Sequence, residues 1–196
     1  MSRYSELVHK EPARLGRPRS EQAREAVLHA VDDLLLEVGY AAMTMKGIAE
    51  RAGVGRQTVY RWWSTKAEIL FEASVIDAEQ ELAVPLTGNP LDDLTGYLDG
   101  LVRFLVDSPA GAAYRALLGE AQHDSTVAEL IATKDVIGDS ARLLIQSTLP
   151  GSGPADLGAA MLVGPTFFWI VSGRDPDQLA TGVLANNFLA ELRARK

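Results

Sequence analysis

Apolar residues recur three or four positions apart along almost the whole chain, and no long stretch alternates apolar with polar residues. Such spacing gathers apolar side chains on one face of a helix, whereas a half-buried strand would need alternation. With 47% hydrophobic residues among 196, the chain can bury a core. The pattern predicts an all-α protein of about nine helices.

Turn and capping residues set the expected helix ends. The first helix starts near Ser20 and stops at Gly39, and Thr44 caps a short helix that follows. A capping box at Thr65 and Glu68 opens a long helix that Pro85 ends. The further helices are expected at about 45–52, 56–63, 91–107, 112–121, 126–149, 155–172 and 176–193.

Composition excludes several kinds of chemistry. The chain has no cysteine, and its three histidines are scattered, so thiolate sites and disulfides are impossible and no metal-ligand spacing occurs. The first twenty residues carry charge and proline where a secretory signal needs an apolar core. We expect a cytoplasmic protein that has no metal or other cofactor.

An uncharged stretch at 157–173 raises the question of a membrane span. Its 17 residues are marginal for a bilayer, and glycine, proline and threonine dilute its apolar character. The composition favours a helix buried in a core or subunit interface over a membrane span.

Charge is unevenly divided along the chain. Residues 1–66 hold 11 Lys and Arg against 8 Asp and Glu, whereas residues 67–196 hold 8 against 18. Only the N-terminal third can favour phosphate, which is typical of a local DNA-binding surface on an acidic body. The alternative is random variation among solvated faces.

The segment from Thr44 to Lys66 fits the template of a helix-turn-helix. Small or apolar residues occupy the positions where the two helices and their turn meet: Ile48, Ala49, Ala52, Gly53, Val54 and Val59. The outward positions hold residues suited to bases and phosphates: Lys46, Arg56, Gln57, Thr58, Tyr60 and Arg61. The alternative is an ordinary helical hairpin with a tight glycine turn.

These residues, together with Gly16–Arg19 and the helix end at Gly39 and Tyr40, resemble the tetracycline-repressor (TetR) family of regulators. The resemblance covers about residues 14–75. A weaker one involves the segment from Gly164 to Phe168. The resemblance to the TetR family implies an Ω-shaped homodimer that places one recognition helix per subunit in the major groove of a palindromic operator.

The resemblance also implies roles for individual residues. Arg56 and Gln57 would read bases, since Arg pairs with guanine and Gln with adenine. Lys46 would lie near a base, Arg61 would reach a base or a phosphate, and Trp62 could use only its indole N–H. Backbone contacts would come from Thr44, Thr58, Tyr60, Trp62 and Lys66, and minor-groove or phosphate contacts from Arg17 and Arg19 in an N-terminal arm. The alternative for the arm is a solvated tail.

Three residues depart from the family pattern. Gly55 stands where relatives commonly have a Ser or Thr cap, Gly47 interrupts the short helix, and Trp62 and Trp63 are bulkier than the usual pair. We expect Trp63 to belong to the core.

We divide the chain into an arm (1–19), a three-helix DNA-binding domain (20–66) and a helical effector-binding and dimerisation domain (67–196). The expected effector-pocket residues are Tyr97, Phe104, Tyr114, His123, Thr166, Phe167 and Trp169. The expected dimer-interface residues are Phe168, Leu179, Val183, Leu184, Asn187 and Phe188. Aromatic residues at helical spacing are also common in cores, so core packing is the alternative for the pocket set.

The sequence thus predicts a repressor that binds double-stranded operator DNA, that a small molecule releases, and that needs no membrane. One alternative is a constitutive DNA-binding protein whose C-terminal core is filled. Another is an all-helical enzyme, for which the chain offers only the adjacent acids Asp32–Asp33 and Asp92–Asp93 and no phosphate loop or nucleophile motif.

Overall fold

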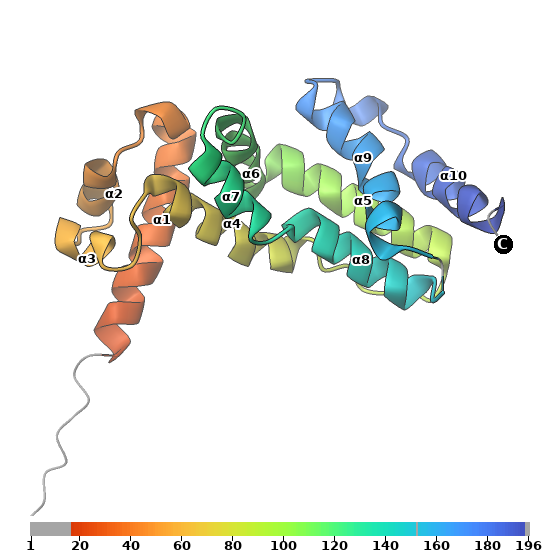
Figure 1. Cartoon of the computed structure of the whole chain (residues 1–196), viewed down its shortest axis with the longest axis horizontal. Helices are drawn as coiled ribbons and strands as arrows, with labels where there is room; N and C mark the ends of the chain where they lie inside the picture. Colours follow the sequence, from red (N-terminus) through yellow and green to blue (C-terminus); the bar gives the residue numbers. More distant parts are fainter. Residues whose placement is uncertain (1–16, 152, 195–196) are drawn as a thin grey trace, which may run out of the picture.

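The computed structural model describes residues 17–151 and 153–194, with side chains from Ser20 onward (Figure 1). Within these ranges the regular structure is entirely helical, which confirms the all-α prediction. The helices are α1 (Arg17–Ala42), α2 (Met45–Arg51), α3 (Arg56–Tyr60), α4 (Lys66–Glu81), α5 (Pro90–Asp107), α6 (Pro109–Glu120), α7 (Ser125–Ala132), α8 (Val136–Thr148), α9 (Ala155–Val171), the 3-10 turn η1 (Pro176–Gln178) and α10 (Thr181–Ala194).

The N-terminal helices follow their local signals closely. α1 begins three residues before Ser20, and its regular path is interrupted at Gly39, whose φ of +75° favours glycine. Thr65 caps α4 by accepting a hydrogen bond from the Glu68 amide at 3.2 Å. The Glu68 carboxylate in turn accepts a hydrogen bond from the Ser64 amide at 2.8 Å, so the predicted capping box has formed, but with the residue before Thr65 as the donor.

The segment between α4 and α5 is fixed against α5. α4 ends at Glu81, before the predicted stop at Pro85, and residues 83–89 continue without a helix. Asp93 of α5 accepts hydrogen bonds of 2.6 Å from both the amide and the hydroxyl of Thr87. Val84 lies against Gly96 and Gly100, where a Cβ atom would stand 3.4 and 3.8 Å from its methyl groups.

Two later helices differ from the prediction. The expected helix at 126–149 is in fact two, α7 and α8, because Thr133 ends the first and Asp135 caps the second through the Gly138 amide. Asp124, rather than Thr126, caps α7. The last expected helix is also divided, since Asp175 and Pro176 open only the 3-10 turn η1 before α10 begins at Thr181.

Two hydrophobic cores lie at opposite ends of the described structure, and α4 runs from one to the other (Figure 1). The first core joins α1, α2, α3 and the first half of α4 to residues of α6 and α7, including Leu117 and Val127. The second joins the end of α4 to α5, α8, α9 and α10. Residues of α6 thus pack inside the core that holds the N-terminal helices.

The uncharged stretch at 157–173 lies mainly in α9. None of the helices in the described ranges has the length and apolar character needed to cross a membrane.

Candidate nucleic-acid interface

α2 and α3 meet at the tight turn that the sequence predicted. The Thr44 hydroxyl caps α2 by accepting a hydrogen bond from the Gly47 amide at 3.0 Å. Gly53 has a φ of +66°, the left-handed conformation that the turn needs. Ile48 and Val59 are fully buried between the helices. Gly55 begins α3 without a side-chain cap, as its lack of a hydroxyl requires.

Polar contacts fasten this pair of helices to α1 and α4. On α2, Arg51 binds Glu37 of α1, with an Nη1–Oε1 distance of 2.9 Å, and lies 3.4 Å from Asp33. Trp63 is buried, and its indole N–H donates to Glu72 of α4 at 2.9 Å, which supports its expected place in the core. These contacts orient α3 relative to the rest of the chain.

The outer face of α3 carries cations without a carboxylate partner. Arg56 and Gln57 are exposed, and among the described residues no ion pair forms with Arg56 or Arg61. The Arg61 guanidinium lies 4.8 Å above the ring of Trp62. Because Arg51 is already bound to α1, Arg56 and Arg61 are the arginines of this segment that remain free for an anionic partner.

The other residues predicted to contact DNA differ in how exposed their side chains are. Thr44 and Tyr60 are exposed, whereas Thr58 and Trp62 are half-buried. Lys46 is exposed and lies 3.5 Å from Glu50, a surface pair that contributes little stability. The side chains of Arg17 and Arg19 lie outside the described part of the structure.

Lys66 has a role that the sequence did not reveal. Its ammonium donates to the Tyr40 carbonyl at 2.6 Å and to the Met43 carbonyl at 3.1 Å, and lies 4.2 Å from the Tyr40 ring centroid. Lys66 therefore ties the start of α4 to the end of α1. Only one of its three protons is left for the phosphate contact that the resemblance implied.

Comparison with known proteins agrees with this geometry. Residues 27–73 match the family model for bacterial regulatory proteins of the tetR family. The uncharacterized HTH-type transcriptional regulator YdeS of Bacillus subtilis is 41% identical over 119 residues, which cover 61% of this chain and 60% of YdeS. The helix-turn-helix part of the chain thus matches the TetR family.

Further relatives carry the same kind of name. The DNA-binding transcriptional repressor TetR of Mycobacteroides abscessus is 30% identical over 58% of this chain and 60% of that protein. The chain thus spans about three fifths of the length of these two curated relatives. Their names describe regulators rather than enzymes, in agreement with the expectation that this chain is not an enzyme.

The fold extends the likeness beyond the matched segment. A transcriptional regulator from Rhodococcus sp. superimposes with a TM-score of 0.64 at 22% identity, covering 86% of this chain and 96% of the other. At that identity the likeness concerns the fold alone. It shows that the helices after α4 also follow an arrangement found in a solved regulator.

The residues predicted to form one effector pocket lie in several places. Tyr97 lines a cavity against α4 and α8, while Tyr114 and Phe167 line another between α6, α8 and α9. Phe104 is buried in the core at 1% exposure, though it also borders a shallow hollow beside Ser108. His123 is exposed in the turn after α6. Thr166 is fully buried, and the Trp169 indole donates to the Asp175 carbonyl at 2.8 Å.

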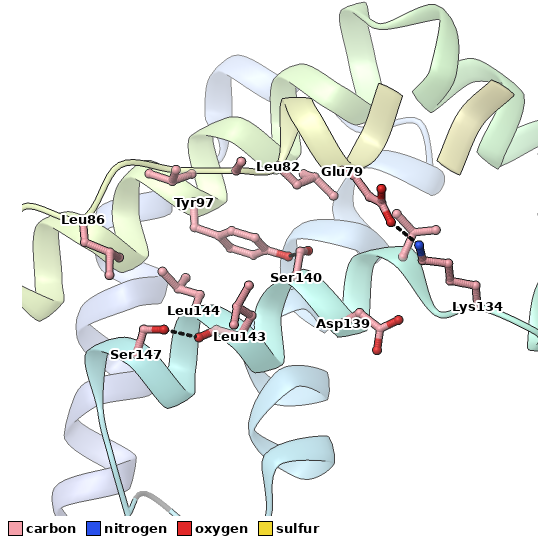
Figure 2. A pocket seen from close by; sticks show the side chains of 13 residues that line it. Glu79, Leu82, Leu86, Tyr97, Lys134, Asp139, Ser140, Leu143, Leu144 and Ser147 are labelled. Carbon is pink, nitrogen blue, oxygen red and sulfur yellow. Dashed lines mark hydrogen bonds and ion pairs between the residues drawn. The ribbon is translucent and has the colours of Figure 1, made fainter. Parts of the chain in front are cut away.

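The cavity that Tyr97 lines measures about 480 Å³ (Figure 2). Its walls come from the end of α4 and the following segment, from α5, and from α8 with the residues just before it. The lining residues are Glu79, Leu82, Ala83, Val84, Leu86, Tyr97, Lys134, Val136, Asp139, Ser140, Leu143, Leu144 and Ser147. Tyr97 alone was predicted from the sequence. The apolar and hydroxyl residues of α8 share a face of that helix. This spacing is the sequence pattern from which the lining residues of α8 could have been predicted.

The predicted dimer residues divide between surface and core. Phe168 and Val183 are 59% and 57% exposed on α9 and α10, and Asn187 is exposed as well. Leu179 and Leu184 are half-buried. Phe188 is a correction, because its ring is 5% exposed and packs in the subunit's own core, which leaves little of it for a partner.

Proposed function

We propose that this chain is a homodimeric transcription repressor that binds palindromic double-stranded DNA and releases it when a small molecule binds. The observation that carries the proposal is the outer face of α3 and its C-cap, where Arg56, Gln57 and Arg61 are exposed and the two arginines form no ion pair with any described residue. Guanidinium and amide groups so placed suit base edges and phosphates of the major groove. Such a protein would act in the cytoplasm, at the chromosome.

Arg56→Ala tests the assignment of the base readers. We expect it to lower affinity for a sequence selected from random DNA by about ten- to a hundred-fold, because a bidentate pair with guanine contributes about 1–3 kcal/mol. Affinity for unselected DNA should fall much less. Titration of labelled duplexes at fixed salt would measure both, and Arg103→Ala on α5 is the control of equal charge. Unchanged affinity and preference in Arg56→Ala would show that α3 does not read the sequence.

An exposed apolar face supports the homodimer. Phe168 and Val171 lie on one side of α9, and Val183 lies on the neighbouring α10, all about half exposed or more. Aromatic and aliphatic side chains gathered on two adjacent helices are typical of a subunit interface. Two subunits joined there would hold two copies of α3 at a fixed separation, as a palindromic site requires.

Charge placed on this face should break the dimer. We expect Phe168→Glu combined with Val183→Glu to sediment as a monomer at micromolar concentration, because two carboxylates would be buried without partners. Leu36→Glu, at a position 65% exposed on α1, is the matched control and should remain dimeric. A monomeric wild-type protein at that concentration would refute the dimer.

The cavity beside α4 supports a response to a small molecule. Its volume of about 480 Å³ falls within the usual range for ligand pockets, about 300–1,000 Å³. α4 begins in the core of the helix-turn-helix and ends in the wall of this cavity, so a ligand that moves α4 would also move α3. The ligand must bind the altered arrangement better, and DNA affinity falls by that difference. A constitutive DNA-binding protein would be expected to have this space filled.

A further inference from the structure

The ionisable groups that line the α4–α8 cavity are all paired within the described structure. Glu79 of α4 forms an ion pair with Lys134, which stands just before α8 (Figure 2). Asp139 pairs with Arg142 one turn further along α8. A charged ligand would therefore find no unpaired group of opposite charge in the cavity wall. The free energy lost when its charge leaves water would not be offset by a new ion pair.

The mouth of the cavity is apolar and open to water. Leu143 of α8 is 67% exposed and Leu86 is 52% exposed, although both line the cavity. Deeper in the wall, Leu82 and Leu144 are buried. A bound molecule that covers the two exposed leucines would remove their surface from water, at about 25 cal/mol for each Å² covered.

One polar group in the wall keeps a free acceptor. The Tyr97 hydroxyl lies 3.1 Å from the Ile137 carbonyl and 2.8 Å from the Ser140 hydroxyl, and Ser140 lies within 2.9 Å of the same carbonyl. Whether Tyr97 donates to the carbonyl or to Ser140, its oxygen keeps at least one lone pair that these neighbours do not use. Burial raises the pKa of Tyr97 to about 12, against the opposing effect of the Ser140 hydrogen bond, so the phenol is neutral at physiological pH.

We propose that the α4–α8 cavity binds an uncharged, largely apolar molecule that donates one hydrogen bond to the Tyr97 oxygen. The proposal rests on the proposed effector response and specifies the chemical class of the effector. The paired charges exclude an ionic ligand, the open leucines favour an apolar one, and the Tyr97 oxygen selects a hydroxyl or amide donor. The ligand lies between α4 and α8, beside the Glu79–Lys134 pair that links them.

Three probes of matched shape test the class: 4-butylbenzyl alcohol, 4-butylbenzoate and 4-butylbenzylammonium. Calorimetric titration of the protein should give the alcohol a dissociation constant at least about ten-fold below those of the two ions, because burying an unpaired charge is costly. Equal or tighter binding of either ion would overturn the proposal. Failure of all three to bind would overturn it as well.

Variants locate the bound probe. Ser147→Phe places a ring in the cavity and should abolish alcohol binding, whereas Gln146→Phe, at the neighbouring exposed position that does not line the cavity, should leave it unchanged. Tyr97→Phe should weaken the alcohol about three- to ten-fold, as expected for one lost hydrogen bond, and should leave butylbenzene binding unaltered. Thermal midpoints without probe check that each variant is folded. Alcohol binding that survives Ser147→Phe would place the ligand elsewhere and refute the assignment.

Binding and DNA release are measured separately, so the two proposals can fail independently. An alcohol that binds as described but leaves the selected duplex bound would support the chemical class and contradict the release mechanism. A carboxylate or ammonium that binds in the cavity and releases the duplex would support the effector response and overturn the class.

Discussion

Adding a single methyl group at Gly111 is expected to lower the free energy of unfolding by more than about 4 kcal/mol. A Cβ atom there would lie 1.7 Å from the Phe104 carbonyl oxygen and 2.6 Å from its carbon, where α6 folds back on α5. The corner cannot easily yield, since the Ser108 hydroxyl binds the Ala110 amide at 3.1 Å and Glu81 at 2.7 Å. Urea unfolding of Gly111→Ala, followed by circular dichroism, measures the loss.

Gly119→Ala is the matched control in the same helix. No atom lies within 4 Å of the position of its Cβ, so the methyl group would meet only open space. Alanine also favours helix over glycine by up to about 1 kcal/mol, and Gly119→Ala should be neutral or slightly stabilising. Equal changes in the two variants would mean that the close approach of α5 does not distinguish Gly111 from Gly119.

The helix-turn-helix could be predicted in detail because its signals are local. The Thr44 cap, the left-handed Gly53 and the pairing of Thr65 with Glu68 each act within a few residues, and each is found in the structure. The inward positions Ile48 and Val59 are likewise fixed by helical spacing. Such features can be predicted from sequence because both partners of each hydrogen bond lie within a few residues of each other.

The later helices were harder to predict because competing local signals look alike. Thr126 and Glu129 have the spacing of a capping box, yet the carboxylate of Asp124 takes the Thr126 amide first. Asp135 caps α8, which begins at Val136, by accepting a hydrogen bond from the Gly138 amide, at a point where apolar spacing continues unbroken. The sequence contains several residues that could cap each helix. Which of them does so depends on how the resulting helix packs against the rest of the fold.

The cavity and the dimer face depend on contacts that are distant in sequence. Phe104 and Phe188 are apolar positions on amphipathic helices, as are Phe168 and Val183, and only packing distinguishes the buried from the exposed pair. Of the aromatic residues predicted for a pocket, Tyr97 alone lines the cavity beside α4. Besides Tyr97, the cavity beside α4 is lined by residues between Glu79 and Leu86 and by one face of α8 with the residues just before it.

Leu117→Ala is expected to lower the free energy of unfolding by about 2–5 kcal/mol and to weaken DNA binding, although Leu117 belongs to α6. Its side chain is fully buried in the core that also contains Ile48, Val59 and Leu70. The cavity left by the lost methyl groups would loosen the support of α2 and α3. Urea unfolding followed by tryptophan fluorescence in a Trp169→Phe background, which retains Trp62 and Trp63, reports on that end of the molecule.

Leu118→Ala provides the contrast, because the neighbouring Leu118 is half-buried and packs against the second core, away from the helix-turn-helix. It should leave the tryptophan transition and DNA affinity closer to those of the unaltered protein. A tryptophan transition that Leu117→Ala does not shift would mean that residues 20–66 fold as an independent unit. A shift would mean that α6 is part of the folding unit that presents α3, so that α6 as well as α4 connects the second core to α2 and α3.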